Sequence, residues 1–188
     1  QLSKFPGIGK KSALRMALHL LKRDEGDTIE LSQALVNLRT EIKFCKECYN
    51  ISDAELCNVC SSPSKDTSTV CVVRDFQDVL AIENTGQYNG LFHVLGGLIS
   101  PVDGIGPSDV KIPELIQRVE RGEIKEIIIA LSSTLEGDTT EYYISKKMHD
   151  LGLKVSTLSK GIAVGGELEY ADEITLARSI RNRVNLEV

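Results

Sequence analysis

Two Cys-x-x-Cys pairs stand close together in the sequence, at Cys45 and Cys48 and again at Cys57 and Cys60. Each pair supplies two thiolates from one tight turn, and the eight residues between the pairs let the second turn fold back over the first. This spacing predicts a tetrahedral zinc site. Four thiolates close the coordination sphere, so the predicted role of the zinc is structural, ordering a segment that lacks an apolar core. Mixed charges between 43 and 55 argue against direct contact of this module with DNA.

The composition is that of an ordinary soluble protein. Apolar residues make up 41% of the 188 residues, and no apolar run approaches the roughly 20 residues that a membrane span needs. No signal-peptide pattern opens the chain, and four of its five cysteines have zinc spacing, so we expect a reducing, cytoplasmic setting without membrane association. Cys71, the fifth, is expected to be a small buried hydrophobe. The chain does not start with Met, and we expect a few natural residues to precede Gln1.

Positive charge is concentrated at the start of the chain. Residues 1–23 contain six basic residues and no acidic residue, whereas the remainder holds 16 basic and 27 acidic residues. The net charge of −5 therefore hides a positive region, and a phosphate group responds to the potential within a Debye length of it. The overall charge does not exclude a nucleic-acid partner.

Gly7 and Gly9 belong to a turn that resembles the hairpin of the helix-hairpin-helix DNA-binding motif. Two glycines allow a tight turn, and the amides that start the next helix point toward an anion. Lys10, Lys11 and Arg15 add charge that attracts any phosphate backbone without reading its sequence. An ordinary turn followed by a solvated basic helix is the alternative, and the absence of acids throughout this region favours DNA binding.

Apolar runs alternate with segments of helical spacing after a polar linker at 61–68. Strands are predicted at 70–73, 91–95, 127–131 and 154–158, and helices at 76–82, 112–119 and 139–151. This alternation implies a parallel sheet with right-handed crossovers. Two amphipathic helices are expected upstream, one from Ser12 to Leu21 and one over 31–42 with start signals at Thr28 and Glu30. The predicted fold class is α/β, with small helical and zinc-knuckle modules before a parallel-sheet domain.

Glu136 and Asp138 follow the predicted strand at 127–131. Carboxylates at the carboxyl end of a parallel strand lie where α/β sheets present their sites, and such a pair can hold Mg²⁺ for phosphoryl chemistry. The same pair can instead cap the next helix and favour its dipole. The spacing alone favours this second interpretation and leaves Mg²⁺ binding open.

The order of these motifs resembles that of the bacterial RecR family of recombination mediators. Matching stretches run through the chain, at 5–9, 45–60, 100–107, 135–138 and 164–170. The resemblance implies four parts: a helix-hairpin-helix with a connecting helix over 1–44, a four-Cys zinc motif over 45–62, a Toprim domain over 69–160, and a C-terminal segment for subunit contact over 161–188. Most of the first helix of the hairpin motif would precede Gln1.

The resemblance also implies a function without catalysis, in recombinational DNA repair in the bacterial cytoplasm, associated with the nucleoid. Family members form dimers and ring-shaped tetramers that encircle single- or double-stranded DNA. They help RecO, and possibly RecF, to load RecA onto gapped DNA coated by single-strand-binding protein. By position, Lys10, Lys11 and Arg15 would face DNA, and Glu136 and Asp138 would be the Toprim acids that engage RecO. The stretch 164–170 and a helix at 173–183 would make subunit contacts.

One position departs from the pattern of catalytic Toprim domains. Such domains carry a Glu after the first strand, where this chain has Arg74 followed by Asp75. A cation beside Glu136 and Asp138 would neutralise them and compete with Mg²⁺, unless Asp75 takes the place of the Glu.

Two other functions stay open beside the DNA clamp. A Mg²⁺-dependent Toprim enzyme acting on DNA strands would use the acid pair, but the sequence offers no convincing nucleophile, and His93 and His149 are isolated. A zinc-stabilised interaction scaffold that never touches DNA is opposed by the acid-free residues 1–23.

Overall fold

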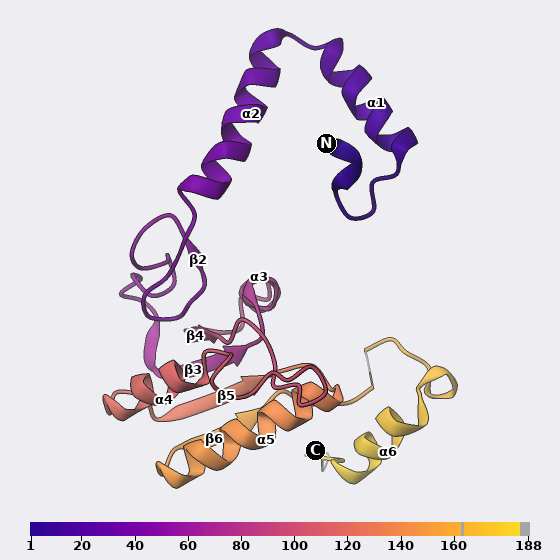
Figure 1. Cartoon of the computed structure of the whole chain (residues 1–188). Coiled ribbons are helices and arrows are strands. Elements are labelled where there is room, and N and C mark those ends of the chain that lie inside the picture. Colours follow the sequence, from indigo (N-terminus) through magenta and orange to yellow (C-terminus); the bar gives the residue numbers. More distant parts are fainter. Residues whose placement is uncertain (163, 185–188) are drawn as a thin grey trace. The chain divides into compact units, whose positions relative to one another are not determined.

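The second compact unit of the chain is built on a parallel sheet (Figure 1). The computed structural model describes residues 1–162 and 164–184 and divides the chain into the units Gln1–Lys43 and Phe44–Val188. In the second unit, four parallel strands lie in the order β4-β3-β5-β6. Their bounds are β3 (Asp66–Val73), β4 (Gly90–Val94), β5 (Glu126–Ala130) and β6 (Lys154–Thr157). The predicted α/β fold with a parallel sheet is confirmed.

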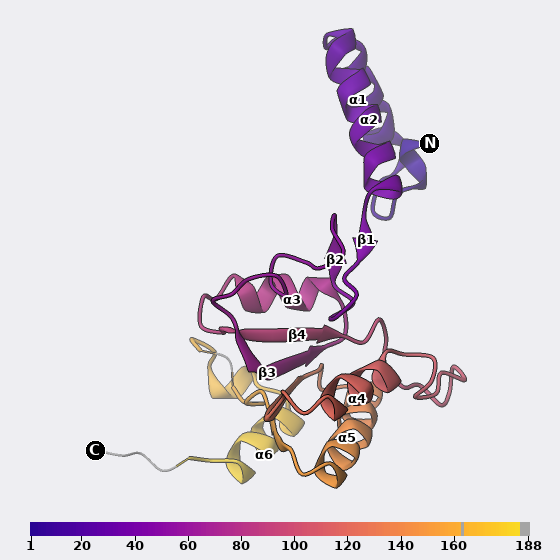
Figure 2. The ribbon, with the colours of Figure 1, turned by 90° about the vertical axis from the view of Figure 1, so that its left-hand side faces the viewer.

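Helices cover both faces of this sheet. Val70 and Val72 of β3 belong to the core shared with α4 (Ile112–Glu120) and α5 (Leu135–Asp150). Cys71 and Val73, which alternate with them, pack instead with Val79 of α3 (Phe76–Glu83). Figure 2 shows α3 on one side of β3 and β4, with α4 and α5 on the other. Period-two alternation therefore sends successive side chains into two cores, and the expected burial of Cys71 is confirmed.

Short polar side chains set where the helices of this domain begin. Asp75 and Asp78 form a capping box at the start of α3. The Thr134 hydroxyl accepts a hydrogen bond from the Gly137 amide and caps α5, which begins at Leu135. The prediction that this helix starts at 139 was wrong by one turn, because a threonine cap outside the apolar pattern starts it.

The zinc-knuckle module begins with the short strands β1 (Lys43–Phe44) and β2 (Ile51–Ser52) and packs against the sheet domain. The Val94 amide of β4 donates to the Cys48 carbonyl at 2.8 Å. Glu47 accepts two hydrogen bonds from Arg121, at 2.8 and 2.9 Å. The Tyr49 ring meets His93 edge-on, with centroids 5.5 Å apart. Main-chain, charged and aromatic contacts together fix the module on the sheet.

The first unit contains η1 (Leu2–Lys4), α1 (Lys10–Leu21) and α2 (Glu25–Thr40), and no residue of these helices is buried. The Asp24 carboxylate accepts a hydrogen bond from the Gly26 amide and caps α2. The predicted start signals at Thr28 and Glu30 were therefore wrong, because Asp24 begins the helix one turn earlier.

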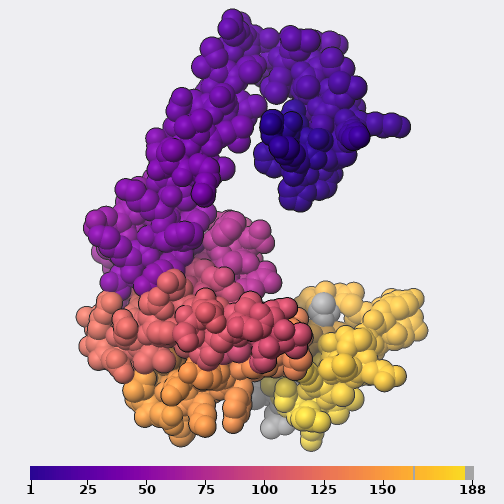
Figure 3. Space-filling view, viewed as in Figure 1, coloured from indigo at the N-terminus to yellow at the C-terminus, as the bar shows by residue number. Residues whose placement is uncertain are grey.

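The C-terminal part of the second unit contains η2 (Leu168–Tyr170) and α6 (Glu173–Arg181). Figure 3 shows it as a yellow lobe beside the sheet domain. Residues 163 and 185–188 of the predicted subunit-contact segment are outside the described residues. The predicted helix at 173–183 corresponds to α6, which ends at Arg181. Among the described residues, no helix is both long and apolar enough to cross a bilayer.

Candidate functional site

The four cysteines converge as the sequence predicts. The Sγ atoms of Cys45, Cys48, Cys57 and Cys60 all lie within 4.8 Å of one another, and the first three side chains are buried. A tetrahedral zinc with Zn–S bonds of about 2.3 Å requires sulfurs about 3.8 Å apart, so this spacing fits the ion. The Cys48 and Cys57 sulfurs are 3.5 Å apart.

The chemistry of the thiol cluster also fits a divalent cation. Hydrogen bonds from Cys48 and Cys60 lower the pKa of Cys57, whereas hydrogen bonding to Cys57 raises the pKa of Cys48. Cys57 therefore ionises readily, and the negative charge of its thiolate opposes ionisation of the neighbouring thiols. Zinc removes that repulsion by coordinating all the thiolates at once. The ion would be closed off from substrate, so its chemistry is structural.

The acid pair lies at the carboxyl end of β5, in the first turn of α5. Asp138 makes two ion pairs, one through each carboxylate oxygen. Lys160 Nζ is 3.2 Å from Oδ1, and the Arg178 guanidinium is 2.9 Å from Oδ2. Lys160 also contacts Glu141 at 2.7 Å. Among residues 1–162 and 164–184, the Glu136 carboxylate makes no ion pair or hydrogen bond, so the two acids have different environments.

These contacts keep Asp138 charged. Burial raises the pKa of Asp138, but hydrogen bonds from Arg178 and Lys160 outweigh it and hold the pKa below its usual range. The carboxylate is ionised at neutral pH and already compensated by two cations. Both cations were missed at the sequence level. Lys160 follows β6 and could have been placed at the same sheet edge by the strand argument, whereas no sequence pattern pointed to Arg178.

Arg74 does not take the role expected for it. Its guanidinium pairs with the neighbouring Asp75, at 2.9 Å, and no contact joins it to the acid pair among the described residues. Asp75 is also engaged, because its carboxylate accepts a hydrogen bond from the Gln77 amide as the cap of α3. The prediction that Arg74 neutralises the acids was therefore wrong, and both carboxylate oxygens of Asp75 already have hydrogen-bond partners.

The start of α1 carries the residues predicted to contact DNA. Gly7 has a positive φ of 76°, a conformation that glycine adopts without steric cost. Gly9 caps the helix with extended backbone and contributes no side chain to its first amides. Lys10, Lys11 and Arg15 are all exposed. Unbonded amides, the positive end of the helix dipole and exposed cations therefore lie together, an arrangement that suits a phosphate.

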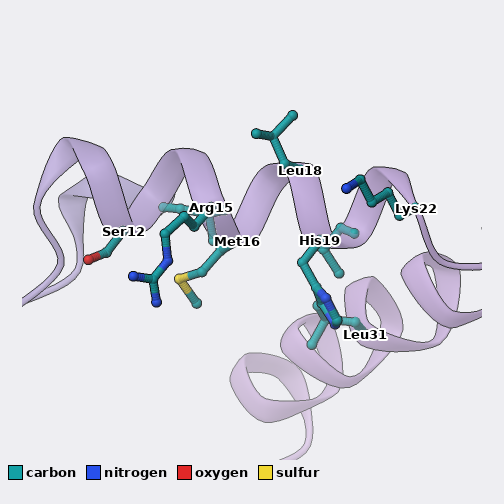
Figure 4. A pocket seen from close by; sticks show the side chains of 9 residues that line it. Ser12, Arg15, Met16, Leu18, His19, Lys22 and Leu31 are labelled. Carbon is teal, nitrogen blue, oxygen red and sulfur yellow. The ribbon is translucent and has the colours of Figure 1, made fainter.

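A groove of about 770 Å³ in the first unit is lined in part by Arg15. Figure 4 shows Arg15, Met16 and His19 of α1 pointing into it, with Leu31 of α2 close to His19. His19 is exposed and lines this groove. The groove is lined largely by apolar side chains, so it resembles an uncovered contact surface more than a catalytic pocket.

His93 is buried and structural. Its Nε2 lies 2.7 Å from the Lys111 carbonyl, so Nε2 carries the proton and donates. Burial lowers the pKa of His93 to about 4, which keeps the ring neutral. Its Nδ1 has no hydrogen-bond partner among the described residues. The buried ring packs edge-on against Tyr49 of the zinc module.

The parallel sheet with acids at its carboxyl edge places the chain among Toprim-domain proteins, and a Toprim domain model matches residues 68–159. Three further family models, all of RecR, match the flanking parts: its helix-hairpin-helix over 1–39, its four-cysteine zinc finger domain over 42–62, and its C-terminal region over 161–184. The chain belongs to the RecR family of recombination proteins, and the structural zinc is that of the family's four-cysteine module.

Relatives named "Recombination protein RecR" match nearly the whole chain. The protein of Bacteroides thetaiotaomicron is 56% identical over 183 residues, which cover 97% of this chain and 89% of the relative. That of Flavobacterium johnsoniae is 55% identical over 187 residues, covering 100% of this chain and 91% of the relative. That of Amoebophilus asiaticus is 54% identical, with 98% and 92% covered.

Proposed function

We propose that this chain is a DNA-binding clamp without catalytic activity that acts in recombinational repair in the bacterial cytoplasm. In this role it helps RecO, and possibly RecF, to load RecA onto gapped DNA coated by single-strand-binding protein. Membership of a family of recombination proteins supports the general role. The finer role rests on three properties of the chain, which concern the hairpin, the first unit as a whole and the acid pair.

The start of α1 is the observation that carries DNA binding. Lys10, Lys11 and Arg15 are exposed and have no acidic neighbour in the first turn of the helix. Together with the free amides of that turn they attract phosphates, whatever the base sequence. One such patch binds weakly. Several copies of the chain around one DNA would multiply the effect, because the second and later contacts become intramolecular.

The uncovered apolar surface of the first unit supports a homo-oligomer. No residue of η1, α1 or α2 is buried, yet many of their apolar side chains are large. Leu14, Leu21, Ile29 and Leu38 each expose more than 60% of their surface. A segment of this size cannot form a stable core alone. A second copy of the same chain is the partner we propose for this surface, in a dimer or in a ring of four.

The acid pair supports partner binding better than metal catalysis. Asp138 is already compensated by Lys160 and Arg178. Within the part of the chain that the structure describes, the four cysteines are the one group of three or more His, Cys, Asp or Glu side chains spaced to hold a metal. Phosphoryl chemistry would need more carboxylates around Mg²⁺ than Glu136 provides. The unpaired charge of Glu136 suits a partner that presents a basic surface, and RecO is the partner we propose.

The test is an incubation of the protein with labelled gapped DNA and Mg²⁺, divided between a native and a denaturing gel. We expect a shifted band on the native gel and intact strands on the denaturing gel. Affinity should fall steeply with salt. Lys11→Glu and Arg15→Glu should each weaken binding at least about tenfold at moderate salt and reduce the salt slope, because each removes a phosphate contact.

Lys146→Glu is the matched control, because Lys146 is exposed on α5 and undergoes the same charge change outside the hairpin. Equal loss with this control would contradict a DNA site at α1. Cut strands that become intact in Glu136→Gln would overturn the clamp in favour of a Mg²⁺-dependent enzyme. Normal affinity after both hairpin charge reversals would contradict a DNA site at α1, and no binding by the unaltered protein at low salt would favour an interaction scaffold that does not use DNA.

A further inference from the structure

The segment after β6 is attached to the sheet domain mainly through charge. Among residues 1–162 and 164–184, three polar contacts join this segment to α5: Lys160 with Asp138, Lys160 with Glu141, and Arg178 with Asp138. Both cations come from the segment, and both acids come from α5. The contact therefore pairs two cations of the C-terminal segment with two acids near the start of α5.

Apolar packing adds little to this attachment. No residue of α6 is buried, and Ile174 and Ile180 expose 68% and 60% of their surface. A groove of about 720 Å³ remains between the start of α5 and α6, lined by Leu135, Asp138, Lys160 and Arg178 among others. Without a shared core, the position of α6 depends on the ion pairs more than that of any helix packed on the sheet.

The same ion pairs occupy the oxygens that a metal ion would use. Lys160 takes Oδ1 of Asp138 and Arg178 takes Oδ2. A Mg²⁺ or Mn²⁺ ion bound by Glu136 and Asp138 needs one of these oxygens, and two adjacent cations would repel it. The ion could bind the pair only after Arg178, Lys160 or both had moved away.

We propose that α6 is an electrostatic latch over the acid pair: Arg178 and Lys160 hold the C-terminal segment on α5 through Asp138, and docking of α6 and binding of a divalent cation exclude each other. By thermodynamic linkage, whatever releases the latch strengthens cation binding, and a bound cation favours release of the latch by the same factor. The latch needs neither DNA binding nor RecO, so it stands apart from the proposed clamp function.

Hydrogen exchange tests the latch in the whole, zinc-loaded protein. In Asp138→Asn and in Arg178→Gln, amides of residues 173–181 should exchange about fivefold faster or more than in the unaltered protein, the effect expected when a partly exposed ion-pair network is broken. Amides of β3 and β5 should be unchanged, which shows that the sheet stays folded. Arg181→Gln is the matched control, because Arg181 is on the same helix without a contact to the acid pair among the described residues.

Mn²⁺ binding followed by electron paramagnetic resonance tests the exclusion. Arg178→Gln should bind Mn²⁺ several times more tightly than the unaltered protein, and Arg181→Gln should not. The added affinity should disappear when Glu136→Gln is combined with Arg178→Gln. If Arg178→Gln disturbs β5, Lys160→Gln provides the same test from outside α6. Unchanged exchange of α6 in both latch variants, or equal Mn²⁺ affinity with and without Arg178, would overturn the proposal.

Discussion

Gly137, between Glu136 and Asp138, has a steric reason to be glycine. It is buried, and a Cβ atom there would collide with the carbonyl oxygen of Ser132. Gly137→Ala should therefore destabilise the sheet domain by about 1–3 kcal/mol through overpacking, measured by urea unfolding. Gly26→Ala is the control, because a Cβ there meets Asp24 at an ordinary 3.8 Å. An unchanged midpoint for Gly137→Ala would contradict the close approach.

The sequence could predict the residues of the acid site only in part. Glu136 and Asp138 were found because the carboxyl ends of parallel strands share an edge. Their different environments could not be predicted, because Arg178 lies 40 residues from Asp138 along the chain and reaches it only through the folded position of α6. A local pattern carries no information about such a contact. The same applies to the pairing of Glu47 with Arg121.

Individual elements were predictable where burial is strong. The observed β5, Glu126–Ala130, differs from the predicted strand by one residue at each end, because a continuous apolar run marks a strand buried on both faces. Helix starts were less predictable. α2 and α5 both begin about one turn before their predicted starts, at caps supplied by Asp24 and Thr134. A search for capping side chains ahead of each apolar pattern would have found both.

The zinc knuckle is the element whose order depends on a metal. Cys57→Ser should abolish zinc binding and unfold the module, so that Tyr49 loses its contact with His93. The sheet should stay folded, because Val70 and Val72 belong to a separate core. Zinc content together with hydrogen exchange of 45–60 and of β5 measures both effects. Cys71→Ser is the comparison that should keep its zinc. A module that stays protected without zinc would contradict a structural role for the ion.

At the scale of the whole molecule, the first unit needs a partner that covers its exposed apolar side chains. Leu18→Asp should dissociate the proposed oligomer, because it places a charge in the apolar surface of α1, where Leu18 exposes 47% of its area. Sedimentation at several concentrations measures the change. Leu80→Asp on α3 is the control, with 56% exposed outside that unit. A monomeric unaltered protein, or one that Leu18→Asp leaves associated, would contradict a second copy on this surface.

The order of the modules could be predicted from the motifs. The lack of buried residues in the helices of the first unit could not be predicted. Leu31, Leu35 and Leu38 have the spacing of a helix with one apolar face. That spacing is the same whether the face is covered by the same chain or by another copy. The structure supplies the difference, since these side chains expose 44%, 50% and 62% of their area.

The hydrogen bond from Val94 to the Cys48 carbonyl also bears on solubility. β4 is an outer strand, and the outer side of such a strand offers unpaired amides and carbonyls to any extended chain that passes. The zinc knuckle covers part of that side. Loss of the metal would therefore expose the outer side of β4. Strands of other molecules could then pair with β4 while the sheet itself was still folded. In zinc-poor cells, the first sign of damage to this protein should be aggregation, ahead of any unfolding of its core.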